Sequence, residues 1–266
     1  MSKIGFIGTG NMGGALARAA AHTNHTLYLT DGLPEKAATL AEEIGAIATT
    51  AEEILLSCDA VFLGVKPQML PALANQLRDT LTTKSEPILI ISMAAGVTLE
   101  VLEGLFGTKN PIIRIMPNTP VGVGEGMIVW CASSTASAND TALLGDILAH
   151  AGRLDELPEH LMDAATAVMG CGPAFVDLFI EALADGGVKC GLPRDKALVY
   201  ATQMVYGSAK LVDVSGKHPG ELKDAVCSPG GSTIEGVSAL EEGGFRGLTM
   251  AAVEASFEKT KALNQK

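Results

Sequence analysis

The sequence predicts an α/β fold, with a doubly wound, mostly parallel sheet in the first half and only helices in the second. Up to about residue 157, short apolar runs rich in β-branched residues alternate with segments of helical periodicity. This alternation is typical of a parallel sheet covered by helices on both faces. After Pro158 the strand pattern disappears. We therefore expect one domain at 1–157 and a second, all-helical domain at 158–266.

In the first half, each predicted strand is a short, nearly continuous apolar run, as expected for a strand buried on both faces. Pro87 and Pro111 each precede a predicted strand, where a missing N–H group costs little. The strands are predicted at 3–7, 26–30, 60–65, 88–92, 112–115 and 127–131, and helices between them at 12–21, 35–44, 71–81 and 99–106.

The second half has helical periodicity throughout. Pro173 and Pro193 stand where the first residue of a helix would fall. Helices are predicted at 159–168, 173–190, 193–214, 220–226, 233–242 and 248–263. The longest of these helices are too apolar for a monomer, so we expect them to bury each other across a dimer interface.

The composition excludes several classes of protein. Of the 266 residues, 47% are hydrophobic and 18% are charged, which excludes an intrinsically disordered chain. A net charge of −11 argues against nucleic acid as a partner, because binding a phosphate backbone needs clustered basic charge. The five cysteines form no Cys-x-x-Cys pair, so we expect reduced thiols and no metal site. We see neither a signal peptide nor an apolar run of the ~20 residues that cross a membrane, and expect a cytoplasmic protein without a membrane partner.

A glycine-rich turn, Gly8-Thr9-Gly10-Asn11-Met12-Gly13, joins the first predicted strand to the first helix. Gly8 would allow the tight turn, Gly10 would let the backbone approach a diphosphate, and Gly13 would let the helix pack on the strand. The free N–H groups at the helix start attract anions. The turn therefore predicts a Rossmann-type dinucleotide site, although an ordinary strand–turn–helix with accidental glycines would have the same pattern.

The second predicted strand ends at Thr30 and Asp31, where a dinucleotide fold reads the adenosine ribose. An acidic residue here normally accepts hydrogen bonds from the ribose and repels a 2′-phosphate, which favours NAD. The next residues, 32–34, are Gly-Leu-Pro, so the loop could turn Asp31 away. Lys36 is the one basic candidate nearby. These residues leave the choice between NADH and NADPH open.

Two further turns follow predicted strands and would line the nicotinamide side of the groove, because ligands of such sheets bind outside the carboxyl ends of the strands. The residues of these turns are Val65, Lys66, Pro67, Met93, Ala94 and Ala95. Lys66 could equally be a solvated surface lysine. Asn118, after the fifth strand, could orient the nicotinamide carboxamide, or it could be only a turn residue between two prolines.

The most distinctive segment is 219–235, in which two glycines precede Ser232-Thr233-Ile234-Glu235. This spacing predicts a capping box at the start of a helix. Glycines and hydroxyls before a helix start leave free N–H groups that would hold a carboxylate. A plain connection between two helices is the alternative, although two loop glycines are costly unless a positive φ or a close approach requires them.

These motifs resemble the pyrroline-5-carboxylate reductase family over nearly the whole chain. The resemblance is carried by IGFIGTGNMG, GVKP, SMAAGVT, MPNTP, GCGPAF, EALADGGVKCGLPR and above all HPGELKDAVCSPGGSTIEGVSALEEGGFR. It implies a Rossmann domain, a helical dimerisation domain, and dimers assembled into larger rings. The implied reaction is the reduction of 1-pyrroline-5-carboxylate to L-proline, the last step of proline biosynthesis. NADP(H) is favoured over NAD(H), although the loop 30–33 differs from the Ser-rich loop that commonly holds the 2′-phosphate.

The resemblance also implies roles for individual residues. Ser228, Gly230, Gly231 and Ser232 would bind the substrate carboxylate. Thr233 would be catalytic, with its hydroxyl near the ring nitrogen, and Glu159 would lie near the substrate amine. The family's cofactor positions fall on Ile7, Gly8, Thr9, Gly10, Asn11, Met12, Val65, Lys66, Pro67, Ala94 and Ala95, to which the strand-end argument adds Thr30, Asp31, Met93 and Asn118.

Hydride transfer to a C=N bond requires an electron-poor carbon held against the nicotinamide. A cyclic imine that arrives as its iminium needs to be positioned and to receive one hydrogen bond from a hydroxyl; it does not depend on a strong acid. The five histidines are scattered along the sequence, which agrees with a site that has no histidine acid. Two other functions are considered. A β-hydroxyacid dehydrogenase usually needs a lysine early on a helix of its second domain, and no lysine lies between Pro158 and Val188. A non-catalytic nucleotide sensor would tolerate Thr233→Ala.

Overall fold

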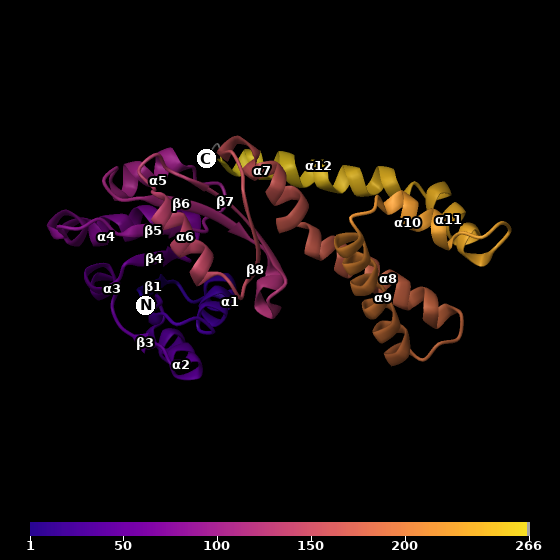
Figure 1. Ribbon diagram of the computed structural model, residues 1–266, viewed down its shortest axis with the longest axis horizontal. Coiled ribbons are helices and arrows are strands. Elements are labelled where there is room, and N and C mark those ends of the chain that lie inside the picture. The colour runs from indigo at the N-terminus through magenta and orange to yellow at the C-terminus, as the bar shows by residue number, and fades with distance from the viewer. Residues whose placement is uncertain (265–266) are drawn as a thin grey trace. The chain divides into compact units, whose positions relative to one another are not determined.

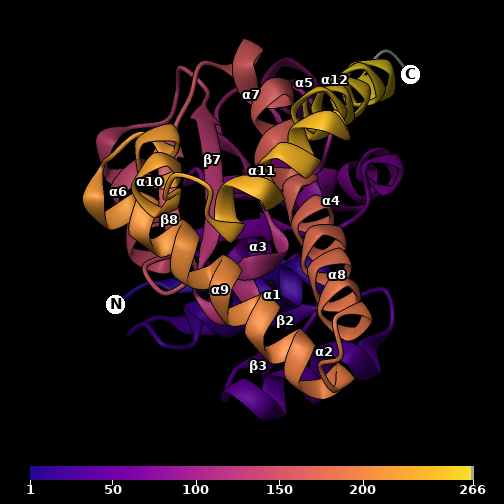
Figure 2. The same ribbon diagram turned by 90° about the vertical axis from the view of Figure 1, so that its right-hand side faces the viewer.

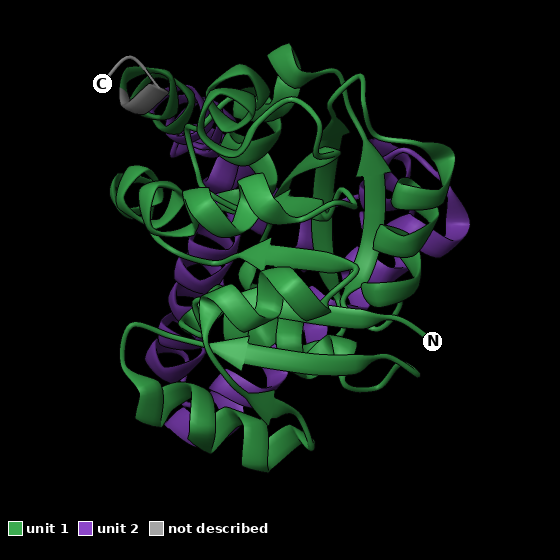
Figure 3. Ribbon diagram, turned by 90° about the vertical axis from the view of Figure 1, so that its left-hand side faces the viewer, with its two compact units in different colours: residues 1–170, 256–266 green, residues 171–255 purple. Residues whose placement is uncertain are grey.

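The computed structural model describes residues 1–264, which fall into two compact units (Figure 1). The first unit comprises Met1–Gly170 and the described residues from Ser256 onward, and the second comprises Cys171–Ala255 (Figure 3). The strand-rich first half and the helical second half confirm the predicted fold class. The domain boundary at 157/158 stays a prediction, because these units are defined by compactness and not by the type of element.

An eight-stranded sheet forms the centre of the first unit, in the order β3-β2-β1-β4-β5-β6-β7-β8. The strands β1 to β6 are parallel, β7 runs antiparallel to β6, and β8 is parallel to β7. The bounds are β1 Lys3–Ile7, β2 Thr26–Thr30, β3 Ile47–Ala48, β4 Ala60–Leu63, β5 Leu89–Ser92, β6 Ile112–Pro117, β7 Gly126–Ala132 and β8 Gly152–Glu156.

The six predicted strands are present, and the two edge strands β3 and β8 were not predicted. Both residues of β3 are exposed, and β8 has the polar sequence GRLDE with no buried residue. A strand at the edge of a sheet can lack the continuous apolar run that marks a central strand, so the sequence pattern does not reveal it.

Helices cover both faces of the sheet, as the prediction of a doubly wound fold requires. One hydrophobic core contains Leu16 of α1, Leu40 of α2 and Ile147 of α6, and the other contains Ile54 of α3, Leu77 of α4 and Leu102 of α5. The helices of this unit are α1 Asn11–Ala20, α2 Pro34–Ile44, α3 Ala51–Ser57, α4 Leu70–Thr83, α5 Leu99–Phe106, α6 Ala138–Ile147 and α7 Met162–Ala165, with short turns at η1 Pro67–Met69, η2 Thr119–Val123, η3 Glu159–Leu161 and the π-helical η4 Thr166–Gly170.

The second unit is made of helices and buries little apolar surface of its own. Helices α8 and α9 lie side by side (Figure 2), and Ala184, Ala197 and Ala201 are the buried members of their core. Large side chains such as Leu178 (66%) and Val199 (61%) stay exposed. The helices are α8 Gly172–Lys189, α9 Arg194–Ser215, α10 Pro219–Val226, α11 Ser232–Glu242 and α12 Phe245–Asn264, the last of which begins in this unit and ends in the first. Exposed apolar surface of this kind marks an interaction site.

Among the described residues, the helical stretch Glu159–Lys189 is by length and composition apolar enough to cross a membrane, with a mean hydropathy of 1.6 over its 18-residue window. The prediction that no stretch meets this requirement was therefore wrong. The reason is that the helices predicted at 159–168 and 173–190 continue into each other, with few charged residues between them. A core helix of a soluble protein passes the same test, and a helix that packs against a second chain needs the same composition.

Candidate functional site

The glycine-rich turn is built by close backbone contacts. Gly8 has a φ of 99°, which a side chain would strain. A Cβ atom on Gly13 would lie 2.1 Å from the carbonyl oxygen of Gly8, and one on Gly64, after β4, would lie 2.5 Å from the same oxygen. These contacts agree with the tight turn predicted at Gly8 and the close packing predicted at Gly13, whereas the cofactor-binding role of Gly8 stays a prediction. Gly64 was not predicted as a close contact because the predicted strand extends to residue 65, although a glycine inside an apolar run is itself a signal of close approach.

Gly10 differs from its neighbours because it faces open space. No atom lies within 4 Å of the position that its Cβ would take. Gly10 is also the N-cap of α1, where no side chain caps the helix and no acidic residue occupies the first turn. The N–H groups of this first turn are therefore available to an anion, and the helix dipole favours one. This is the cradle that a dinucleotide diphosphate requires.

Asp31 is turned toward the glycine-rich turn. Its Oδ2 accepts hydrogen bonds from Thr9 N at 2.7 Å and Thr9 Oγ1 at 3.1 Å, and its Oδ1 accepts one from Leu33 N at 3.0 Å. Partial burial opposes ionisation, but these hydrogen bonds and the charge of Lys36 outweigh it, so the pKa of Asp31 is lowered from its ordinary value. Asp31 is thus an ionised carboxylate fixed between β2 and the turn.

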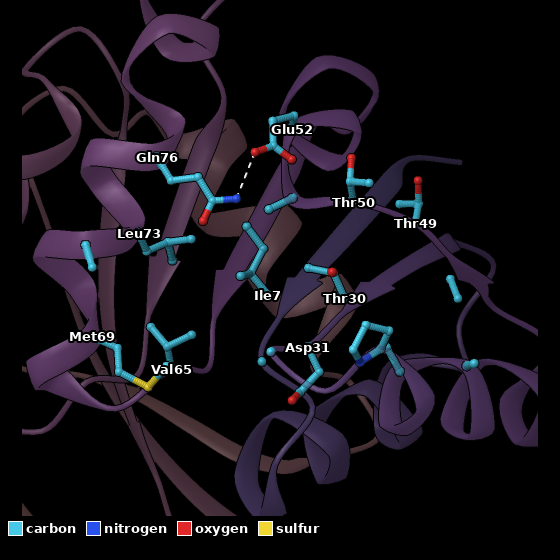
Figure 4. A pocket seen from close by; sticks show the side chains of 18 of the residues that line it. Ile7, Thr30, Asp31, Thr49, Thr50, Glu52, Val65, Met69, Leu73 and Gln76 are labelled. Atoms are coloured by element: carbon cyan, nitrogen blue, oxygen red, sulfur yellow. Dashed lines mark hydrogen bonds between the residues drawn. The ribbon is translucent and has the colours of Figure 1, made fainter.

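A cavity of about 810 Å³ opens beside this carboxylate, at the carboxyl ends of β1 and β2 (Figure 4). Its walls include the apolar side chains of Ile7, Val65 and Leu73, which suit a flat apolar ring such as adenine. Glu52 also lines the cavity and accepts a hydrogen bond from Gln76 Nε2 at 2.8 Å. This bond is the main reason that the pKa of Glu52 is lowered. The cavity and the open helix start together fit a dinucleotide.

The other predicted cofactor loops lie at the same edge of the sheet, because β1, β4 and β5 are parallel neighbours. Val65 and Met93 are half-buried and Ala94 is buried, whereas Lys66 and Ala95 are exposed. Among these residues Val65 lines the cavity. The exposed Lys66 is the N-cap residue of η1, and Pro67 is the first residue of that turn.

Asn118 and Glu159 are already engaged within the first unit. The amide of Asn118 donates to the carbonyl oxygen of Met169 at 3.0 Å and accepts from Met127 N at 2.9 Å. Glu159 Oε1 accepts from Leu99 N at 2.7 Å and from Arg114 Nη1 at 3.1 Å. These bonds anchor the chain, and the predicted cofactor role of Asn118 and the predicted substrate role of Glu159 stay predictions.

Arg114 is a buried charge that was not among the predicted functional residues. It lies on β6, is 2% exposed, and pairs with Glu159 and, at 3.6 Å, with Asp163 Oδ1. The signal that could have marked it is a single charge inside the apolar run IIRIMP, since a buried charge needs a partner. Burial, with the nearby charge of Glu159, also raises the pKa of the Cys131 thiol to about 11.

The predicted substrate loop connects α10 to α11 within the second unit. Gly230 has a φ of 68°, and Gly231 N donates to the carbonyl oxygen of Ser228 at 3.0 Å. The capping box predicted at 232–235 was wrong: Gly231 is the N-cap, Ser232 is the first helical residue, and no side chain caps α11. The reason is that the extended backbone of Gly231 takes the N-cap position one residue earlier. The N–H groups of the first turn, which includes Thr233, are therefore left for an anion.

Comparison with known proteins agrees with both halves of the chain. Residues 159–263 match a family model for pyrroline-5-carboxylate reductase dimerisation, and residues 3–96 match one for NADP oxidoreductase, coenzyme F420-dependent. The pyrroline-5-carboxylate reductase of Escherichia coli (strain K12) is 39% identical over 99% of this chain and 98% of its own, and that of Pisum sativum is 38% identical over 98% and 96%.

Two solved structures extend this similarity to three dimensions. The pyrroline carboxylate reductase of Plasmodium falciparum, solved with NADP bound, has a TM-score of 0.84 at 36% identity and covers 99% of this chain and 98% of its own. The pyrroline-5-carboxylate reductase of Coxiella burnetii has a TM-score of 0.90 at 30% identity and covers 100% of this chain and 99% of its own. The chain therefore belongs to the pyrroline-5-carboxylate reductase family.

Proposed function

We propose that this protein reduces the C=N bond of 1-pyrroline-5-carboxylate to give L-proline, the last step of proline biosynthesis. The observation that carries the proposal is a pair of uncapped helix starts, α1 after the glycine-rich turn and α11 after the loop 228–231, in a member of this family. The first suits a diphosphate and the second suits a carboxylate. Family membership excludes the two other functions that were considered, a β-hydroxyacid dehydrogenase and a nucleotide sensor.

In the substrate loop, Ser228, Gly230 and Ser232 would hold the carboxylate through N–H and hydroxyl groups. Gly231, whose N–H already donates to the carbonyl oxygen of Ser228, would contribute by leaving room for the carboxylate and keeping the shape of the loop. The positive φ of Gly230 supports this role, because a left-handed residue in a turn is one of the conformations that form anion-binding loops. Thr233, in the first turn of α11, would hydrogen-bond to the ring nitrogen. This bond would fix the imine carbon in one orientation, and orientation is the main contribution that the chain can make to the rate.

The reaction balances without a further acid or metal. A dinucleotide held by residues 7–12 would supply the hydride that the imine carbon accepts. If the substrate arrives protonated on nitrogen, the electron pair of the C=N bond stays on that nitrogen, and the product is the secondary amine of proline. The chain then has to bind the substrate, orient it and exclude water. A substrate loop that offers hydroxyls and N–H groups agrees with this task.

For the dinucleotide, we propose that residues 7–12 hold the diphosphate and that Thr30 and Asp31 face the adenosine. The loops at 65–67 and 93–95 would face the nicotinamide half, because they follow β4 and β5 at the same sheet edge. Asn118 would orient the nicotinamide carboxamide and Glu159 would lie near the substrate amine, each held in place by its own hydrogen bonds. The relatives alone favour NADPH as the donor, and NADH would supply the same hydride.

The helical region that matches the dimerisation model implies a homodimer. The exposed apolar side chains of α8, α9 and α12 support this, since they need a partner to exclude water. We further propose that dimers assemble into a ring and that the protein is cytoplasmic. Sedimentation analysis of the purified protein tests the assembly, and species no larger than a dimer would contradict the ring.

The direct test of function is the loss of NADPH or NADH absorbance when pyrroline-5-carboxylate is added, with L-proline identified as the product. We expect Thr233→Ala to lower kcat by about 100-fold, because the imine is no longer fixed, while the dinucleotide Kd stays unchanged. Thr82→Ala is the matched control, since that exposed hydroxyl bonds only to the carbonyl oxygen of Arg78 in its own helix. Folded wild-type protein that shows no turnover would refute the proposal.

A further inference from the structure

We propose that Asp31 makes this chain prefer NADH, a dinucleotide without a 2′-phosphate, over NADPH. The inference rests on the proposed function and deepens it, because it names the donor from this chain's own residues. It departs from what the family resemblance implies. The starting observation is the cavity beside β1 and β2, which fits the adenosine half of a dinucleotide.

The walls of this cavity carry negative charge and no positive charge. Among the described residues that line it are the carboxylates of Asp31 and Glu52, and none is Lys, Arg or His. Figure 4 shows the two carboxylates on different elements around the same cavity. A 2′-phosphate carries a charge of about −1.5 to −2 near pH 7 and requires cationic or N–H donors. The carboxylates in the cavity wall would repel such a phosphate. A neutral ribose hydroxyl, in contrast, can donate a hydrogen bond to a carboxylate.

Asp31 cannot move away from a 2′-phosphate without losing hydrogen bonds. Its carboxylate accepts three hydrogen bonds, from Thr9 N, Thr9 Oγ1 and Leu33 N, and each of them favours the ionised form. Turning the side chain away would leave the Thr9 N–H group of the phosphate turn without its acceptor. The carboxylate is therefore held in place as an acceptor with lone pairs to spare, which suits the 2′-hydroxyl of a ribose.

Three positive features lie near Asp31 or the glycine-rich turn, and a carboxylate opposes each. The charge of Lys36 acts on Asp31 itself, which partly neutralises it, and Lys36 lines a different hollow together with Glu35 and Glu43. The start of α2 has Glu35 in its first turn. In that second hollow Arg18 is already paired with Glu43 at 2.7 Å. None of these groups supplies an unopposed cation for a 2′-phosphate.

Calorimetric titration of the full chain with NADH and with NADPH tests the inference without using turnover. We expect the Kd for NADH to be lower than the Kd for NADPH by about tenfold, because the carboxylate and the 2′-phosphate are like charges held close together. The ratio of the Kd for NADPH to the Kd for NADH should decrease as salt is added, since exposed charges are screened. Adenosine 2′,5′-bisphosphate and 5′-AMP, titrated in the same way, isolate the contribution of the 2′-phosphate.

Two variants test whether the preference for NADH comes from Asp31 and the loop that follows it. Asp31→Asn should shift the ratio of the two Kd values toward NADPH by about tenfold, and Leu33→Arg should shift it in the same direction by adding a cation while Asp31 is intact. Asp79→Asn, the same change at an exposed position on α4 outside the cavity lining, should leave the ratio unchanged.

The outcomes separate this inference from the proposed function. A wild-type protein that binds NADPH more tightly would overturn the inference and leave the function intact. A preference for NADH that survives Asp31→Asn would overturn the role of Asp31. Failure of folded protein to bind either dinucleotide would overturn the proposed function and the inference with it.

Discussion

The two glycine turns of the molecule end in the same feature, an uncapped helix start, but they are held in different ways. In the first unit, β1, α1 and the loop after β4 approach so closely that the carbonyl oxygen of Gly8 occupies the Cβ positions of Gly13 and Gly64. In the second unit, the space around Gly230 is open, and the turn depends on its positive φ and one hydrogen bond from Gly231. One anion site is shaped by tertiary packing, and the other is shaped by local conformation.

The largest expected effect comes from adding a methyl group where packing shapes the turn. Gly13→Ala should lower the free energy of unfolding of the first unit by about 3 kcal/mol, because the backbone around Gly8 has no room to yield. Denaturation followed by the fluorescence of Trp130, the single tryptophan, measures it. Gly10→Ala is the matched control, and should change the free energy of unfolding by less than about 0.5 kcal/mol while weakening dinucleotide binding. Equal stability of the two variants would break the comparison.

A smaller effect is expected where local conformation shapes the turn. Gly230→Ala should strain the substrate loop by about 1–2 kcal/mol, the cost of a positive φ for a residue with a Cβ atom. We expect a KM for pyrroline-5-carboxylate raised by about tenfold and an unchanged Trp130 transition. Gly236→Ala, within α11 and free of close neighbours, should leave KM unchanged. A loss of stability in the first unit on Gly230→Ala would contradict the idea that the two turns are held independently.

The smallest effect concerns pH. The pKa of Asp31 is lower in the folded chain than in the unfolded chain, so its ionised form stabilises the fold above the ordinary pKa of 3.8. This contribution is lost as the pH falls through the lowered, folded-state pKa. The difference in unfolding free energy between wild type and Asp31→Asn should therefore narrow below about pH 4. Acid denaturation of the two proteins measures it, and a difference that is independent of pH would show that the bonds to Thr9 and Leu33 do not favour the carboxylate.

The parts of the fold that depend on periodicity were predictable from sequence. The strands of the sheet centre and the helices of both halves have apolar patterns that repeat along the chain, and the glycine-rich turn has a fixed spacing. The edge strands β3 and β8 were missed because they bury little and carry no such pattern. The start of α11 was misplaced by one residue because both Gly231 and Ser232 are acceptable N-cap residues, and backbone conformation decides between them.

Contacts between distant segments could not be predicted in this way. The orientation of Asp31 depends on Thr9, which is 22 residues away in the chain, and the partners of Arg114 follow it by 45 residues or more. Sequence spacing carries no information on such pairs, so the direction of Asp31 stayed open and Arg114 went unnoticed. The positions that bear on cofactor choice and on the anchoring of Glu159 were therefore those that needed the structure.

The buried ion pairs of Arg114 limit how this sequence can change over time. Replacing Arg114 leaves the carboxylates of Glu159 and Asp163 without their cation, and replacing either carboxylate leaves the buried guanidinium with one partner instead of two, so each single change is expected to lower the stability of the fold. Exchanging all three residues together for apolar residues of similar volume would leave the free energy of unfolding nearly unchanged. Each single substitution on that route leads through a destabilised protein, so these three positions are expected to be inherited as a unit.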